Sequence, residues 1–187
     1  MTTEQRHGAE ERRALERLLA AVADGDRDAL EQLYHGTRTA VYALALSLLK
    51  NAHDAQDITQ DTFVRVWERA AQYRAPGSPM GWLLTVCRNE ARMLLRRDGR
   101  QTTLDETQWE AIPAECSGLT SEDRALLQQA LAVLESEERQ VVLLHAVTGL
   151  KHREIAALLE KPLSTVLSKY HRAMKKLKVC LKGDDAQ

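Results

Sequence analysis

Residues 151–181 read KHREIAALLEKPLSTVLSKYHRAMKKLKVCL, and this stretch decides the fold class. Its first ten residues have the apolar spacing of a short amphipathic helix, which Lys161-Pro162 interrupts because proline cannot continue a helix. A longer helix follows, in which Val166, Tyr170 and Ala173 share one face. A helix, a tight turn and a second helix in this order predict a helix-turn-helix.

The opposite face of the second helix is polar and basic. Between Leu150 and Lys182 the chain carries 9 basic and 2 acidic residues. Cationic side chains suit DNA phosphates, and polar side chains near the start of such a helix can reach base edges, as we expect of Ser168 and Lys169. The candidate DNA-binding residues of this half are Ser164, Thr165, Ser168, Lys169, His171, Arg172 and Lys175.

Helical patterns also fill the first half of the chain. A helix is predicted over Glu10–Ala23 and ends at a glycine. Asp26 is the expected N-cap of a segment that runs towards His35, and Arg38–Leu49 reads as a separate helix that is apolar on nearly every face. A break follows, and Asp54 is expected to open the next helix.

Residues 54–73, DAQDITQDTFVRVWERAAQY, predict an amphipathic helix with two distinct faces. The apolar face, which we expect in the core, comprises Phe63, Val66, Trp67 and Ala70. A second face is polar and acidic, and it comprises Asp57, Gln60, Asp61 and Glu68. Such a face suits a basic partner surface, although an acidic helix face by itself is more often simply solvated.

RAPGSP at residues 74–79 breaks the helical pattern, and Ser78 is then expected to cap a new helix that has Pro79 in its first turn. In GWLLTVCRNEARMLLRR, residues 81–97, one face is apolar and includes Leu83, Cys87 and Ala91. We expect Trp82 in the core and Cys87 to be a buried small hydrophobe. The other face is cationic and hydrogen-bonding, and it comprises Arg88, Asn89, Arg92 and Arg96.

Residues 98–121 are acidic and rich in turn formers, without a helical period, so they read as a flexible linker. Ser121 is then a suitable N-cap for the helices of the second half. The sequence therefore predicts an all-α protein with two small helical domains joined by a flexible linker, the C-terminal domain containing the helix-turn-helix. The expected bounds are 10–97, 98–121 and 122–182.

Composition limits the compartment and the chemistry. The three cysteines form no C-x-x-C pair, and no apolar run reaches the roughly 18 residues that span a bilayer. We therefore expect a cytoplasmic protein without stable membrane insertion, although a redox role for Cys116 in the linker stays open. The histidines show no metal-ligand spacing, and no nucleophile or carboxylate–metal pattern occurs, so no metal, cofactor or enzymatic activity is expected.

Taken together, these segments resemble the extracytoplasmic-function (ECF) RNA polymerase sigma factors. DAQDITQDTFVRVW is similar to the core-binding signature of sigma region 2, GWLLTVCRNEARMLLRR to the helix that follows it, and GLKHREIAALLEKPLSTVLSKYHRAMKKL to region 4. The chain departs from the usual family pattern at Glu160, Lys161 and Leu167, where a glycine, an apolar residue and a basic residue are common. These departures affect expectations for minus-thirty-five recognition.

The resemblance implies binding to the largest and second-largest subunits of the RNA polymerase core and to promoter DNA, both duplex and single-stranded. The residues with an implied role in core binding are Asp57, Gln60, Asp61 and Glu68. Those with an implied role at the minus-ten element are Tyr73, Arg74, Ser78, Arg88, Asn89, Arg92 and Arg96. Region 4 would read the minus-thirty-five element, and an anti-sigma factor is the expected inhibitor.

Other classes of protein share parts of this pattern. A plain transcription regulator would also carry a helix-turn-helix, but it would not need the acidic helix and would bind its operator without polymerase. A helical adaptor or an anti-sigma protein would explain the acidic surface but not two basic helices. Promoter binding that depends on the core enzyme distinguishes a sigma factor from these alternatives.

Overall fold

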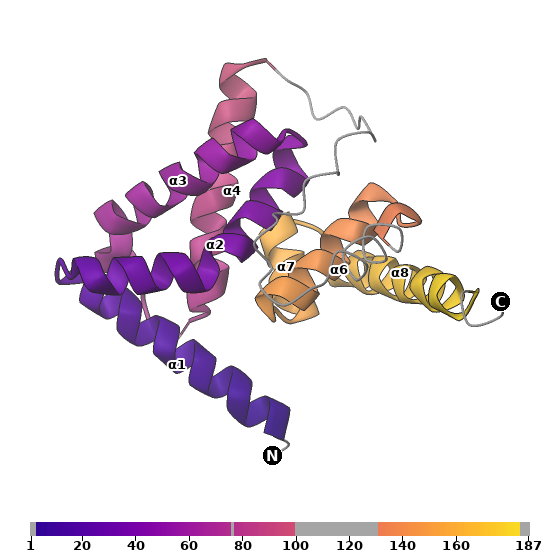
Figure 1. Ribbon diagram of the computed structural model, residues 1–187, viewed down its shortest axis with the longest axis horizontal. Helices are drawn as coiled ribbons and strands as arrows, with labels where there is room; N and C mark the ends of the chain where they lie inside the picture. Colours follow the sequence, from indigo (N-terminus) through magenta and orange to yellow (C-terminus); the bar gives the residue numbers. More distant parts are fainter. Residues whose placement is uncertain (1–2, 76, 100–130, 184–187) are drawn as a thin grey trace. The chain divides into compact units, whose positions relative to one another are not determined.

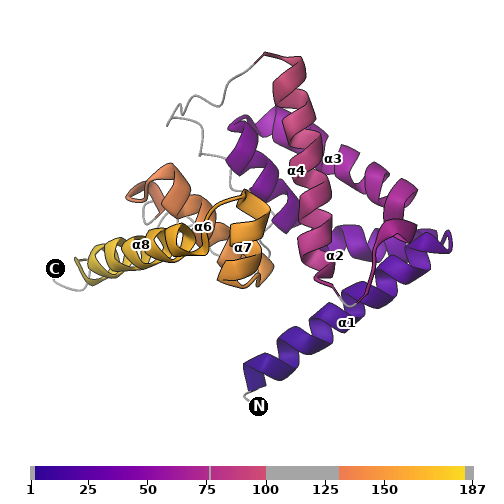
Figure 2. The same ribbon diagram turned by 180° about the vertical axis from the view of Figure 1, so that it is seen from behind.

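The structure is a computed structural model that describes residues 3–75, 77–99 and 131–183. The chain forms two compact units, residues 1–103 and 104–187. Every regular element within the described ranges is a helix, which confirms the predicted all-α fold (Figures 1 and 2). The expected linker, from residue 100 onward, and the predicted cap Ser121 and linker cysteine Cys116 lie outside the described residues.

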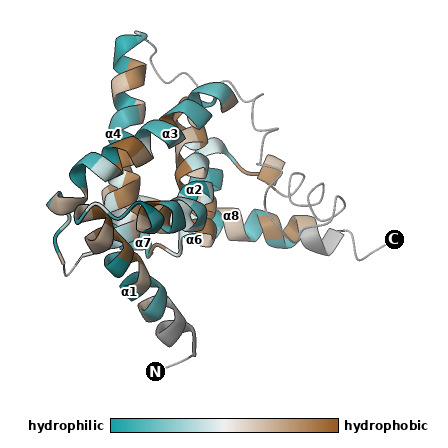
Figure 3. Cartoon of the chain, turned by 60° about the vertical axis from the view of Figure 1, so that its left-hand side comes forward, coloured by the Kyte–Doolittle hydropathy of each residue, from teal (hydrophilic) through white to brown (hydrophobic). Residues whose placement is uncertain are grey.

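The first unit is built around a long central helix. Its elements are α1 (Thr3–Ala23), α2 (Arg27–Leu49), α3 (Ala52–Arg69), the 3-10 turn η1 (Ala70–Gln72) and α4 (Pro79–Arg97). The α2 helix packs against α1, α3 and α4, and α3 packs against α4. Leu44 and Ala45 of α2, Val66 of α3 and Leu84 of α4 are fully buried in the resulting core. Hydrophobic and hydrophilic residues alternate along these helices, as amphipathic packing requires (Figure 3).

The predicted helix ends are confirmed where a capping residue determines them. Gly25 closes α1 with φ +88°, a left-handed conformation that favours glycine. The Asp26 side chain then accepts a hydrogen bond from the Ala29 backbone N–H at 3.1 Å. The Ser78 hydroxyl oxygen accepts one from the Gly81 N–H at 3.1 Å, with Pro79 in the first turn of α4.

Three helix boundaries were predicted wrongly. The first helix begins at Thr3 and not at Glu10. Residues 27–49 form one helix and not two, because Leu33, Thr37 and Ala40 continue a single buried face across Gly36. Thr37 Oγ1 also donates to the Leu33 carbonyl at 2.6 Å within that helix. The α3 helix starts before Asp54, whose backbone N–H is capped by the Asn51 side chain at 2.9 Å.

The second unit contains three helices among its described residues, and they follow a short helical stretch at residues 131–132. They are α6 (Ser136–Thr148), α7 (His152–Leu159) and α8 (Leu163–Gly183). Arg139 is buried, and its guanidinium donates to the carbonyls of Leu131 at 2.8 Å and Leu134 at 3.0 Å. The buried guanidinium thus binds two carbonyls of the segment that leads into α6, and the Leu131 carbonyl also accepts from the Leu134 N–H at 3.2 Å.

Candidate functional site

The outward face of α3 is acidic and also carries two apolar side chains. Asp57, Gln60, Asp61 and Glu68 are all exposed, as predicted from their spacing. The expectation that Trp67 lies in the core was wrong, since Trp67 is 36% exposed, and Val64 beside it is 56% exposed. Phe63, Val66 and Ala70 are buried as expected, so Trp67 lies at the edge of the packed stripe. We call Asp57, Gln60, Asp61, Val64, Trp67 and Glu68 the acidic face.

Arg65 links the acidic face to α4. Its guanidinium donates to Glu68 at 2.8 Å and lies 3.4 Å from the carboxylate of Glu90, a nearly buried residue of α4. The hydrogen bond to Glu68 and the charges of Glu90 and Glu68 raise the pKa of Arg65. Glu90 therefore has a compensating charge, which a carboxylate in this position requires.

The segment from Tyr73 to Pro79 is tied back to the helices around it. Tyr73 stacks edge-on against the half-buried Trp82, with ring centroids 5.9 Å apart, and its hydroxyl donates to Glu16 of α1 at 3.5 Å. Burial, followed by the Glu16 charge, raises the pKa of Tyr73. Arg74 Nη1 donates to the carbonyl of Ala71 at 2.6 Å. Gly77 is needed here, since a Cβ would lie 3.0 Å from the Arg74 carbonyl oxygen.

The second face of α4 is basic and largely exposed. Asn89, Arg92 and Arg96 are exposed and Arg88 is half-buried, which places all four predicted residues on one side of the helix. Leu83, Cys87 and Ala91 are buried on the other side, as predicted. Burial is also the main cause that raises the pKa of Cys87 to about 12, so this thiol is inert at neutral pH.

The turn of the helix-turn-helix closes without glycine. Glu160 has φ 54°, and its N–H donates to the Ala157 carbonyl at 3.3 Å. The Lys161 N–H donates to the Ala156 carbonyl at 3.0 Å. These two hydrogen bonds define a Schellman motif, in which glycine is the usual residue at the left-handed position. Glu160 therefore adopts, at a cost in backbone strain, the left-handed conformation that glycine adopts freely.

The outward face of α8 carries most of the predicted DNA-binding residues. Val166 and Ala173 are fully buried beneath it. The exposed residues of this face are Ser164, Ser168, His171, Arg172 and Lys175, with Thr165 half-buried. Arg172 is 56% exposed, and Lys178 extends the basic surface towards the end of the helix.

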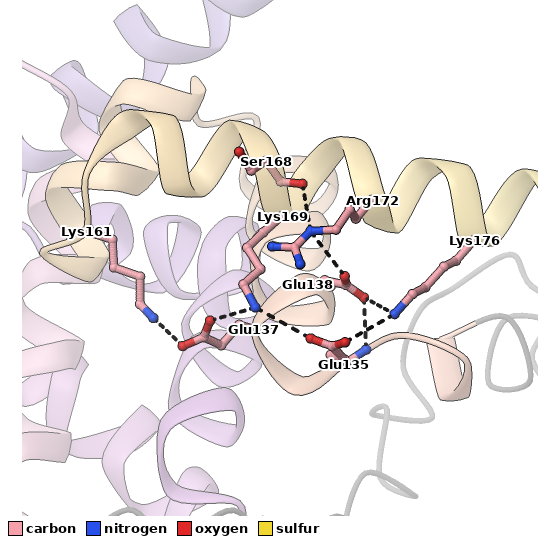
Figure 4. Close-up of polar contacts among 8 residues, drawn as sticks. All are labelled: Glu135, Glu137, Glu138, Lys161, Ser168, Lys169, Arg172 and Lys176. Carbon is pink, nitrogen blue, oxygen red and sulfur yellow. Dashed lines mark hydrogen bonds and ion pairs between the residues drawn. The ribbon is translucent and has the colours of Figure 1, made fainter.

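Lys169 does not lie on this outward face. Its ammonium group lies 3.1 Å from Glu137 and 3.5 Å from Glu135, and the side chain is only 17% exposed. It belongs to a network in which Glu135, Glu137 and Glu138 at the start of α6 hold cations of the turn and of α8 (Figure 4). Sequence reasoning missed this network, because the partners lie 24 to 41 residues apart and share no local pattern.

The members of this network are arranged in two parts. Lys161 of the turn and Lys169 share Glu137, and hydrogen bonds from these two lysines lower the pKa of Glu137. Lys176 lies 3.5 Å from Glu135 and 2.8 Å from Glu138. The network therefore attaches α8 to the start of α6 through Lys169 and Lys176, and it attaches the turn through Lys161.

Two histidines and a tyrosine form an aromatic cluster between α6, α7 and α8. The His145 and His152 rings are stacked with centroids 4.6 Å apart, and Tyr170 contacts His152 edge-on at 4.5 Å. His145 Nδ1 lies 2.8 Å from the Leu150 carbonyl oxygen. Burial, then the charges of His145 and His171, lower the pKa of His152.

Within the described ranges no group of three histidine, cysteine or acidic side chains is placed to hold a metal ion. No helix in the same part of the chain has the length and apolar content needed to cross a bilayer.

Two family comparisons match the two units separately. Residues 33–101 match Sigma-70 region 2, and residues 124–177 match Sigma-70, region 4. The fold and these regions define a transcription initiation factor of the sigma-70 class. Within that class the chain belongs to the ECF RNA polymerase sigma factors, as its similarity to individual members shows.

One such relative is the ECF RNA polymerase sigma factor SigK of Mycobacterium ulcerans (strain Agy99). It is 31% identical over 177 residues, which cover 89% of this chain and 93% of the relative. SigE of Mycolicibacterium smegmatis is 35% identical over 171 residues, which cover 83% of this chain and 64% of that longer protein.

Solved structures support the same fold. The structure of CnrH in complex with the cytosolic domain of CnrY aligns with a TM-score of 0.59 at 25% identity, covering 91% of this chain and 99% of that one. Sigma factor RpoE, in complex with the anti-sigma factor NepR from Bartonella quintana, aligns with a TM-score of 0.56 at 24% identity, covering 81% and 96%.

Proposed function

We propose that this sigma factor binds the RNA polymerase core through the acidic face of α3. The observation that carries the proposal is the exposure of Trp67 and Val64 among the carboxylates of that face. Exposed apolar side chains ringed by charge are typical of protein–protein interfaces, and Trp often contributes strongly to binding. The acidic residues then select a basic surface on the largest subunit of the core.

The test reverses two charges of the acidic face. Asp57→Arg with Asp61→Arg should weaken core binding about ten- to a hundredfold, because like charges then face each other across the interface. Asp24→Arg with Asp28→Arg is the matched control, since both aspartates are exposed and the net charge changes equally. Equal core binding by the two double variants, measured by titration with labelled core, would refute the docking surface.

We further propose that the two basic helices bind promoter DNA. On α4 the assigned residues are Arg88, Asn89, Arg92 and Arg96, with Tyr73, Arg74 and Ser78 in the segment before it, at the minus-ten element. On α8 they are Ser164, Thr165, Ser168, His171, Arg172 and Lys175, at the minus-thirty-five element. The assignment rests on their shared exposed faces and on the phosphate-binding chemistry of arginine and lysine. The corresponding domains are 10–97 and 122–182, joined by 98–121.

Ser168 is the better candidate for a base contact, and Lys169 is no longer one. The Ser168 hydroxyl already donates to the Ser164 carbonyl at 2.8 Å but keeps acceptor capacity, whereas the Lys169 ammonium is engaged by two carboxylates. Footprinting of the holoenzyme on a mapped promoter tests this difference. Ser168→Ala should alter protection at the minus-thirty-five element, and Lys169→Ala should alter the stability of the second unit instead.

Control by an anti-sigma protein is the third part of the proposal. CnrH and RpoE were each solved with a partner protein, and in the case of RpoE the partner is an anti-sigma factor. A partner that engages both units at once would gain affinity through linkage and exclude the core. The test is a competition between core and a candidate encoded beside this sigma factor. A single complex that holds core and candidate together would refute this mechanism.

The requirement for core is what separates a sigma factor from a plain transcription regulator, the other class of protein that a helix-turn-helix fits. Transcription from a mapped promoter by purified core, with and without this chain, distinguishes the two. A sigma factor supports specific initiation only together with core, whereas a regulator protects its operator without core.

A further inference from the structure

A carboxylate is completely buried beneath the outward face of α8. The Glu138 side chain, in the first turn of α6, is 0% exposed. One oxygen, Oε2, accepts from Lys176 Nζ at 2.8 Å and from the Glu135 backbone N–H at 3.1 Å. The other oxygen, Oε1, is buried and accepts no hydrogen bond among the described residues. A buried carboxylate in this position has acceptor capacity that still needs a donor.

The cation nearest to that oxygen is Arg172. Its Nε lies 4.0 Å from Glu138 Oε1, and the same Nε donates to the Ser168 carbonyl at 3.4 Å. Both interactions therefore involve the same nitrogen, Arg172 Nε (Figure 4). Among the described residues the two terminal nitrogens form no hydrogen bond or ion pair, and they make up the edge that can bind a phosphate through two parallel hydrogen bonds.

Glu138 is ionised at neutral pH. Burial alone would raise the pKa of this carboxyl, but the hydrogen bond from Lys176 and the one from the Glu135 backbone outweigh it and hold the pKa below its usual value. Lys176 compensates the charge of Glu138, so the carboxylate can attract the Nε side of Arg172 without presenting an uncompensated negative charge to DNA.

We propose that Glu138 is a positioning residue for DNA binding: it holds the Nε edge of Arg172 so that the terminal nitrogens of the guanidinium are presented to a backbone phosphate. This inference rests on the proposed function of α8. A free arginine side chain loses rotamer freedom when it binds a phosphate, and an arginine that is already held loses less. Glu138 would then strengthen the binding of DNA, although its own negative charge repels the phosphates.

The test measures binding of the full chain to a short mixed-sequence DNA duplex by fluorescence anisotropy over a series of salt concentrations. Arg172→Ala should weaken binding and lower the salt slope by about one. Glu138→Gln should weaken DNA binding about three- to tenfold at low salt. In the Arg172→Ala background the same substitution should not weaken binding further, because the phosphate contact that Glu138 supports is already lost. Loss of folding would instead weaken binding in both backgrounds.

Glu135→Gln is the matched control. It removes the same charge from the same network and faces Lys169 and Lys176, but it has no contact with Arg172. This variant should bind DNA as well as the parent or more tightly. If Glu138→Gln reduces helix content, Arg172→Lys serves as the test variant in its place. Lysine keeps the charge but has no Nε for Glu138 to hold, so Arg172→Lys should bind DNA nearly as weakly as Arg172→Ala.

The outcomes separate the inference from the function on which it rests. Unchanged binding by Arg172→Ala would remove the role of this residue in the proposed DNA interface. A weakened Arg172→Ala together with a Glu138→Gln variant that binds as tightly as the parent, or an Arg172→Lys variant at full affinity, would overturn the positioning role alone.

Discussion

Replacing Glu160 by glycine should stabilise the second unit. Glu160 occupies the left-handed position of the Schellman motif with φ 54°. A non-glycine residue in that conformation costs about 1–2 kcal/mol, and glycine loses about 0.5–1 kcal/mol more backbone entropy on folding. The midpoints of these two ranges leave a net gain of about 0.75 kcal/mol for Glu160→Gly.

Native-state hydrogen exchange of the full chain measures this gain where it arises. Amides of α7 and α8 that exchange through opening of the second unit should exchange about two- to fivefold more slowly in Glu160→Gly. Amides of α2 and α4 in the first unit provide the internal reference and should not change.

Glu160→Ala separates the backbone from the side chain. Alanine removes the carboxylate but keeps the Cβ, so the strain remains and no comparable gain is expected. If Glu160→Gly and Glu160→Ala exchange alike, or if glycine is the less stable of the two, the assignment of strain to this turn is wrong.

Three further outcomes are expected. Asp26→Ala should destabilise the first unit by about 1 kcal/mol in urea denaturation, because it removes the cap of α2, whereas the exposed Asp28→Ala should have a smaller effect. Burial raises the pKa of Cys87 to about 12, so Cys87 should resist a thiol reagent at mildly alkaline pH, whereas the half-buried Cys180 should react. Modification of Cys87 in the folded protein, detected by mass spectrometry, would contradict its burial. The pKa of His152 is lowered in the folded protein, where His145, Tyr170 and His171 lie nearby, so folding favours the neutral imidazole. The contribution of this residue to the stability of the second unit is therefore present above the ordinary histidine pKa of about 6.5 and is lost as the pH falls below it. His152→Phe should reduce this acid sensitivity in denaturation curves followed by circular dichroism.

Local signals in the sequence predicted the helices and most of their ends. Ser78, Asp26 and Gly25 act at helix ends through local contacts and local backbone conformation, so their roles can be predicted from the sequence itself. The break expected before Arg38 was wrong because burial of one continuous face outweighs the low helix propensity of Gly36. Tertiary packing, which periodicity cannot weigh, decided this case.

The exposed faces of α3, α4 and α8 were also predictable, because a period of 3.6 residues assigns each side chain to a side of its helix. What the pattern could not show was how far a packed stripe extends, which is why Trp67 was misplaced. It also could not show that α6 would engage Lys169 and bury Glu138, since those contacts depend on the packing of separate helices.

The exposed pair Val64 and Trp67 limits how this protein can be handled and stored. A net charge of -1 gives molecules little mutual repulsion at neutral pH, so colloidal stability depends on how well apolar surface is covered. With 56% of Val64 and 36% of Trp67 open to water on one helix, α3 is one of the surfaces at which self-association is expected as concentration rises, together with α8, where Val179 is 68% exposed. The surface that we propose for core docking is therefore also one of those that limit the solubility of the free chain.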